Sequence, residues 1–266
     1  MIRTPIFHSI GIKEGVWVRA FLNGLPLYKS AELGPNSRSG PVNDLLVPGE
    51  NELSIELLHA PTPLYSPTLK GAVSLLIYEV TNPDTTPLGK RVIEQAVFPQ
   101  MWEDVPERFR RFPYFYRARF DPGVAIHRPA YLDAPSVSFD CDGTPELREA
   151  VRRVHSAIEQ NDVDRFLQEI ALKLHHAEKA LEGEEWASVA QKSKGFRDEL
   201  FVHHLIARPL VMDDLHFEPR ADGRVAYVTR KDGGFALEAI ARGDPKRRLR
   251  TDLCFTQYAG DWRVFA

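Results

Sequence analysis

Three polar residues in the last third of the chain have the side-chain types that proton-transfer chemistry requires. Asp214 and His216 lie two positions apart in a stretch of alternating hydrophobicity, so a strand there would place both on one face, where one could orient the other. Tyr227 lies in the next such stretch and adds a hydroxyl group. These residues are the candidate pocket group. The alternative is that the acidic residues only begin a strand and remain in solvent.

The most unusual composition is a basic and aromatic cluster at residues 108–120, which read RFRRFPYFYRARF. Such a mixture can stack single-stranded bases, grip phosphates or form the core of a protein interface. A strand here would divide the rings between core and surface, so the arginines either brace the aromatic core or the second domain, or bind a protein partner. The candidate binding residues are Arg108, Arg110, Arg111, Tyr114, Tyr116, Arg117 and Arg119.

The histidines do not have the spacing of a metal site. Adjacent residues on a helix point about 100° apart, so the pairs His175-His176 and His203-His204 cannot chelate one ion from one helical face. Glu199 and His203 have a suitable i and i+4 spacing, but no HExxH-type pattern supplies a third ligand. We expect no metal.

No sequence motif indicates a cofactor or a covalent intermediate. The chain has no Walker loop, no GxSxG elbow and no GxGxxG fingerprint, so we expect no cofactor. Cys141 and Cys254 are far apart, and neither has a second cysteine nearby. We expect two reduced and mostly buried thiols.

The overall composition is typical of a soluble globular protein. The 266 residues are 43% hydrophobic and 27% charged, which excludes a collagen, a disordered chain and a coiled-coil rod. The chain has neither a long apolar run nor the apolar core of a signal peptide, so we expect a cytoplasmic location and no membrane partner. The net charge of −3 gives no field that would attract nucleic acid. An unidentified protein, a small molecule and a second copy of the chain remain as partners.

The two halves of the chain differ in texture, which predicts an α+β protein of two domains. Sixteen of the 20 prolines precede residue 141, and they break the first half into about seven short strands of an all-β sandwich. We place the boundary between Ser136 and Thr144, with domains at 1–140 and 141–266. The strands are predicted at 16–22, 53–57, 72–80, 91–98, 114–120 and 136–140, with a further extended stretch from 42. Asn23-Gly24 and Pro48-Gly49 mark turns.

The second half begins with helices and ends with strands. Thr144 is an N-cap residue and Pro145 fits the first helical position, before the apolar repeat Leu147, Val151, Val154 and Ile158. Further helices are expected at 162–183 and 185–201. An antiparallel meander follows, with strands at 211–218, 224–230, 235–242, 248–257 and 262–265, and Trp262 facing the helices.

Two segments of the second half carry a resemblance. AIEQNDVDRFL at 157–167 and YAGDWRVFA at 258–266 resemble the cone-shaped superfamily of ketosteroid isomerases, SnoaL-like proteins and nuclear transport factors, over residues 146–266. The resemblance implies a curved sheet around helices with a pocket at one end. It implies no single activity, because the same fold hosts enzymes and scaffolds.

A second resemblance lies in the first half. An NG hairpin followed by a PGxNxL turn at 48–53 resembles the jelly-roll accessory domains of glycoside hydrolases, over residues 10–80. It implies a sandwich, and sugar binding would follow if Trp17 or Trp102 were exposed on a concave face. Three hypotheses therefore stand. The leading one is a non-catalytic binding or protein-interaction protein, and the alternatives are a small-molecule lyase or isomerase and a carbohydrate-recognition protein.

Overall fold

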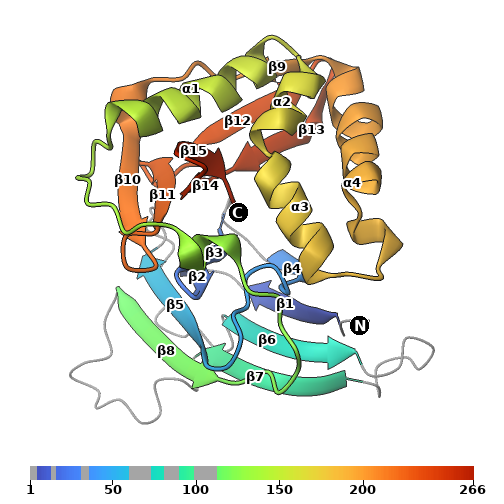
Figure 1. Ribbon diagram of the computed structural model, residues 1–266, viewed down its shortest axis with the longest axis vertical. Coiled ribbons are helices and arrows are strands. Elements are labelled where there is room, and N and C mark those ends of the chain that lie inside the picture. The colour runs from blue at the N-terminus through green and yellow to red at the C-terminus, as the bar shows by residue number, and fades with distance from the viewer. Residues whose placement is uncertain (1–4, 13–15, 31–35, 60–72, 81–89, 99–112) are drawn as a thin grey trace. The chain divides into compact units, whose positions relative to one another are not determined.

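The computed structural model describes residues 5–12, 16–30, 36–59, 73–80, 90–98 and 113–266. The chain divides into two compact units, Met1–Arg128 and Pro129–Ala266, which are described one at a time (Figure 1). The fold class is mixed α and β, with four antiparallel sheets and four α-helices in the described ranges.

The division between the units comes earlier in the chain than the sequence predicts. Residues 129–140, which the sequence pattern assigns to the first domain, belong to the second unit. The hydroxyl of Ser136 donates a hydrogen bond of 2.5 Å to the carbonyl of Asp222, and the amide of Val137 donates to the carbonyl of Gly223 at 3.0 Å. The strand predicted over the last of these residues is wrong, because the segment is irregular and is held by such single bonds.

The first unit contains two four-stranded antiparallel sheets, with the orders β4-β1-β6-β7 and β3-β2-β5-β8. Consecutive strands often change sheet, as β1 to β2 and β3 to β4 do. The strands predicted at β2, β5, β6, β7 and β8 are present, whereas β1, β3 and β4 are additional. Their bounds are β1 (Ile6–Ile12), β2 (Val16–Leu22), β3 (Leu25–Lys29), β4 (Asn36–Pro41), β5 (Asn51–His59), β6 (Val73–Val80), β7 (Lys90–Phe98) and β8 (Tyr114–Phe120).

Alternation along the strands builds the core of this unit. In β5, Leu53, Ile55 and Leu57 are fully buried, and the polar residues between them are only partly buried. In the neighbouring β2, Val18 and Ala20 are buried in the same way. The period of two therefore directs one face of this sheet inward, as the sequence predicts.

The two turn motifs of the first unit are bonded to each other. Asn23 and Gly24 have φ of 54° and 78°, which suits the tight β2–β3 hairpin. The side-chain amide of Asn23 donates to the Asn51 side-chain oxygen at 2.8 Å and accepts from the Glu52 amide at 2.9 Å. Asn51 is 1% exposed and donates to the Gly49 carbonyl at 2.7 Å. These bonds account for the NG and PGxNxL motifs as turn chemistry.

The helices of the second unit begin where the capping residues predict. The Thr144 hydroxyl accepts a hydrogen bond from the Leu147 amide at 3.2 Å, and the Asp162 carboxylate accepts one from the Arg165 amide at 3.0 Å. The helix predicted at 162–183 is wrong as a single element, because it breaks into α2 and α3. The bounds are α1 (Pro145–Glu159), α2 (Val163–Glu169), α3 (Ala171–Ala180) and α4 (Val189–Gly195).

The strands of the second unit form two sheets, with the orders β10-β11-β14-β15 and β13-β12-β9. The strand predicted at 248–257 is wrong as a single element, because β13 and β14 belong to different sheets and Asp252 lies between them. The sequence does not predict β9. The bounds are β9 (Leu205–Ala207), β10 (Leu215–Arg220), β11 (Val225–Arg230), β12 (Leu237–Ala241), β13 (Asp244–Thr251), β14 (Leu253–Tyr258) and β15 (Asp261–Val264).

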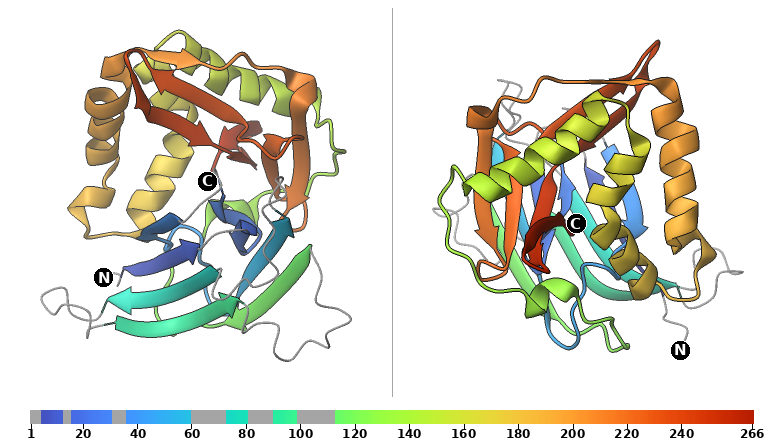
Figure 2. Two further views of the ribbon diagram at one scale, coloured as in Figure 1. Left: turned by 180° about the vertical axis from the view of Figure 1, so that it is seen from behind. Right: turned by 45° about the horizontal axis from the view of Figure 1, so that its top comes forward.

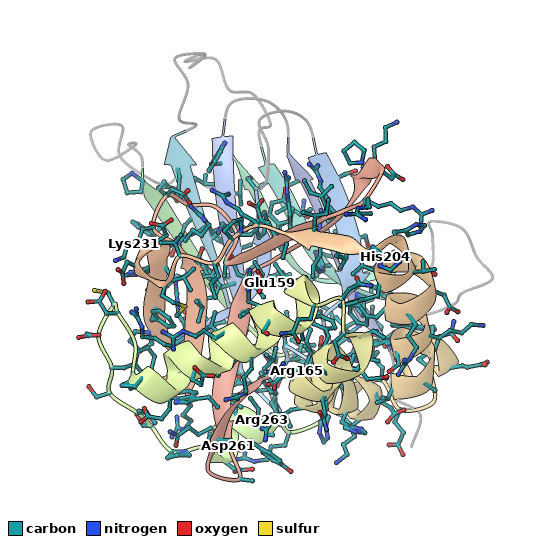
Figure 3. The ribbon with its side chains drawn as sticks, turned by 90° about the horizontal axis from the view of Figure 1, so that it is seen from above. Glu159, Arg165, His204, Lys231, Asp261 and Arg263 are labelled. Atoms are coloured by element: carbon teal, nitrogen blue, oxygen red, sulfur yellow. The ribbon has the colours of Figure 1, made fainter. Side chains whose placement is uncertain are left out.

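Helix α1 supplies the apolar stripe of the second core. Seen from above, it runs across the strands (Figure 3). Its predicted stripe is buried together with Phe217, Phe255 and Trp262. Trp262 is 5% exposed, and the ring of Phe139 meets it edge-on at 6.1 Å between centroids. Over the described residues, none of the helices has the length and apolar character needed to cross a membrane.

Candidate functional site

The candidate pocket residues of the second unit are divided among separate contacts. A carboxylate oxygen of Asp214 lies 3.4 Å from the Arg230 guanidinium. His216 lies opposite Thr229 in the β10–β11 pair. Tyr227 is 1% exposed, and its hydroxyl donates a hydrogen bond to Asp252. Asp214 and Tyr227 therefore have different polar partners, Arg230 and Asp252.

Asp252 is a structural carboxylate that the sequence pattern does not reveal. One oxygen accepts the Tyr227 hydroxyl at 2.5 Å, and the other accepts the Ala236 amide at 3.1 Å. Because Asp252 separates β13 from β14, these two bonds tie the crossing between the sheets to β11 and to the start of β12. The sequence hides this break, because Leu249, Leu253 and Phe255 fit one period-two pattern on both sides of Asp252.

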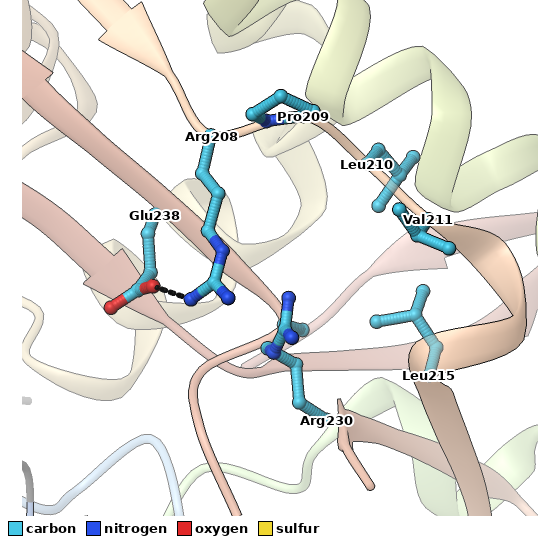
Figure 4. A pocket seen from close by; sticks show the side chains of 8 residues that line it. Arg208, Pro209, Leu210, Val211, Leu215, Arg230 and Glu238 are labelled. Carbon is cyan, nitrogen blue, oxygen red and sulfur yellow. Dashed lines mark hydrogen bonds and ion pairs between the residues drawn. The ribbon is translucent and has the colours of Figure 1, made fainter. Parts of the chain in front are cut away.

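A network of opposite charges lies beside β9 and β12 (Figure 4). Glu238 accepts from Arg208 at 2.7 Å and lies 3.2 Å from Arg250. Arg230 lies 3.0 Å from Asp232. Hydrogen bonding between these last two raises the pKa of Arg230 and lowers the pKa of Asp232. Each charged group of this network therefore lies within ion-pair distance of an opposite charge.

The hollow inside this network is too small for a substrate. Its volume is about 10 Å³, and the side chains of Arg208, Arg230, Val211 and Leu215 line it (Figure 4). That volume is about what a single water molecule requires. The hollow therefore offers no space for small-molecule catalysis.

A wider, open depression of about 590 Å³ lies at the N-terminal end of α1. Its lining includes three acidic residues, one basic residue and a ring, namely Glu146, Glu149, Asp261, Arg153 and Trp262. Asp261 and Arg263 lie side by side at the β14–β15 turn, 3.0 Å apart (Figure 3). The depression is acidic and open to solvent.

The outer surface of the three-stranded sheet exposes an aliphatic pair. Ile206 of β9 lies directly opposite Ile240 of β12, and the two side chains are 57% and 46% exposed. Arg248 of β13 lies opposite Ile240 on the other side. We call this surface the outer face. It comprises Ile206, Arg208, Glu238, Ile240, Arg248 and Arg250.

One signal in the sequence could have revealed half of this surface. Glu238 and Ile240 are two apart, so they share a face of β12, whereas Leu237, Ala239 and Ala241 are buried. The glutamate marks that face as solvated, which makes an isoleucine beside it unusual. Ile206 gives no such signal, because β9 is only three residues long.

The basic and aromatic cluster is described only from residue 113 onward. Tyr114 and Tyr116 lie opposite the buried Leu57 and Ile55, and burial raises the pKa of both phenols. Arg119 is 68% exposed and lies 3.3 Å from Glu50. The tyrosines therefore contribute to the core side of the strand and the arginines to its solvent side.

The remaining candidate binding residues of the first unit either lie outside the described ranges or belong to β2 and β8. Arg108, Arg110, Arg111 and Trp102 lie outside the described residues. Arg117 is exposed in β8, on the same face as Arg119. Trp17 of β2 is partly buried, so it does not offer a fully exposed ring for stacking on a sugar.

The remaining reactive groups have structural surroundings. Within the described ranges no cluster of three His, Cys, Asp or Glu could hold a metal ion. The Nε2 atom of His203 lies 2.8 Å from the Arg247 guanidinium, a cation that disfavours a metal there. Cys254 is buried, which raises the pKa of its thiol. The expectation of burial is wrong for Cys141, which is exposed in the irregular segment before α1.

Comparison with protein-family models, curated proteins and solved structures gave no match for this chain.

Proposed function

We propose that this protein is a non-catalytic interaction protein that binds another protein through the outer face. The observation that supports this proposal most strongly is the pairing of Ile206 with Ile240, both of which are about half exposed. Exposed apolar side chains that adjoin arginines have the composition found in the cores of protein interfaces. The core of the second unit is complete without them, since their strand neighbours fill it.

The arrangement of the candidate pocket group supports this proposal over a lyase or isomerase. A general base requires a carboxylate or imidazole close to a substrate-sized cavity. Asp214 and Tyr227 are engaged with Arg230 and Asp252. The hollow that Arg230 helps to line takes about one water molecule.

The finer fold names are also part of this proposal. We assign the first unit to a jelly-roll-like sandwich, which the two antiparallel sheets and frequent sheet changes support. We assign the second to a cone-type fold, which the order of helices followed by antiparallel strands supports. A cytoplasmic location agrees with the two free cysteines.

The proposal is tested by affinity capture from an extract of the source cells, with identification of the captured proteins. We expect the wild-type chain to retain a specific partner that the double variant Ile206→Ser/Ile240→Ser loses. The matched control is Tyr258→Ser, since Tyr258 is 51% exposed in β14 and lies off the outer face. Equal recovery by all three proteins, or no specific partner for the wild type, would contradict the proposal. Melting curves check that the variants are folded.

A further inference from the structure

The apolar centre of the outer face is fixed by strand register. Leu205 and Ala241 point into the core at 5% and 2% exposure, so Ile206 and Ile240, one position along, must point outward. In the view from behind, β12 and β13 lie in front of α1, and no other described element of the second unit covers them (Figure 2, left). Directly opposite residues are close enough to form one continuous apolar patch.

The charge around this centre is positive. Residues 237–251 contain five Lys or Arg and two Asp or Glu, a net charge of +3, whereas the whole chain has a net charge of −3. Glu238, the acidic residue of the outer face, lies within 3.2 Å of both Arg208 and Arg250. Its charge is therefore compensated within the face, and residues 237–251 as a whole keep a net positive charge.

These observations indicate what kind of molecule the outer face binds. We propose that the outer face docks an acidic protein surface that has an apolar centre, an inference that depends on the proposed function. Complementary charge steers such a partner toward the arginines, and apolar contact with Ile206 and Ile240 holds it there. The rim arginines therefore determine specificity, and the isoleucines supply the buried contact.

A protein fits this surface better than the other polyanions. Single-stranded nucleic acids bind through aromatic side chains on which bases stack, whereas the centre of the outer face is aliphatic. Membrane-surface binding uses an amphipathic helix or a lipid anchor, whereas these isoleucines project from β12 and the edge strand β9 of a sheet. A second copy of the chain would bring two positive faces together if the faces met symmetrically.

The test measures binding of synthetic fluorescent peptides to the full chain by anisotropy. The first peptide contains glutamate and leucine, the second replaces leucine by serine, and the third replaces glutamate by lysine. We expect the first to bind about tenfold or more tightly than the others, with affinity that falls as salt rises. Arg248→Glu/Arg250→Glu should remove this binding. Arg263→Glu, a charge reversal at a 38% exposed side chain of β15, should not.

The inference is overturned if the first peptide shows no preference, or if the charge-reversal variant binds it as well as the wild type. It is also overturned if an RNA oligonucleotide or phosphatidylserine vesicles bind the outer face more tightly than the peptide, or if the chain self-associates through this face. The outcome is separable from the proposed function. A captured partner that requires the isoleucines but tolerates charge reversal would preserve the interaction role and reject the acidic partner.

Discussion

The hydroxyl of Tyr227 donates a hydrogen bond of 2.5 Å to the carboxylate of Asp252, which lies 25 residues further along the chain. This contact joins the middle of β11 to the point at which the chain leaves β13 for β14. Tyr227, whose hydroxyl could serve in an oxyanion hole, therefore helps to hold the two sheets together.

Removing this hydrogen bond should destabilise the second unit. We expect Tyr227→Phe to lower the free energy of unfolding by about 1.5–3 kcal/mol, the range for hydrogen bonds to charged groups. Urea unfolding of Tyr227→Phe, Asp252→Ala and the double variant gives the coupling energy. The exposed Tyr258, changed to Phe, serves as the control. A coupling below about 0.5 kcal/mol would remove the structural role of the pair.

Gly143 and Gly260 form a matched pair for testing close packing before α1. Both have positive φ, at 71° and 87°, so alanine is strained at either site. A Cβ atom at Gly143 would lie 2.8 Å from Cγ of Phe217, whereas at Gly260 nothing lies within 4 Å. Gly143→Ala should therefore lose about 1–3 kcal/mol more stability than Gly260→Ala, as overpacking does. Equal losses in thermal or urea unfolding would show that Phe217 moves aside freely.

His8 should make the first unit sensitive to acid. Burial lowers the pKa of His8 from its usual 6.5, although the Gly40 backbone and the Asp44 charge oppose this shift. Below pH 6.5 the unfolded chain therefore takes up a proton that the folded chain refuses, and stability falls until the lower folded pKa is passed. His8→Gln should flatten this part of the pH profile.

The control for the His8 experiment is His175→Gln, because the side chain of His175 is 60% exposed. Melting temperatures of the three proteins, measured on both sides of pH 6.5, decide the matter. An unchanged pH profile for His8→Gln would assign the acid sensitivity to other groups.

The early unit boundary predicts how fragments behave. Residues 129–140 supply Tyr131, whose ring packs edge-on to Phe265 at 5.1 Å, and the Val137 amide, which is bonded to Gly223. A fragment of residues 129–266 should therefore unfold cooperatively and at a higher temperature than one of residues 141–266. Identical melting curves would show that residues 129–140 do not stabilise the second unit, as the boundary predicted from the sequence implies.

The sequence predicts the local features of this fold well. Thr144 with Pro145 marks the start of α1, and Asn23 with Gly24 marks the β2–β3 turn, because each signal depends on neighbouring residues only. The alternation in β5 likewise follows from one buried face. The confirmed elements are those whose stabilising contacts lie within a few residues.

The features that the sequence does not predict depend on distant partners. Leu249, Leu253 and Phe255 fit one period-two pattern across residues 248–257. Only the pairing of β13 with β12 and of β14 with β11 divides this segment at Asp252. The pairing of Ile206 with Ile240 joins residues far apart in the chain. So do the contacts of Asp214 with Arg230 and of Tyr227 with Asp252. Candidate sites formed by residues so far apart in the chain can be identified only from the tertiary structure.

Hydrogen exchange measured by mass spectrometry can show whether the outer face is the docking surface. The full chain is compared with and without the partner recovered by affinity capture. We expect slower amide exchange in β9, β12 and β13 of the complex. Slower exchange confined to β8, or to the depression at the N-terminal end of α1, would contradict it.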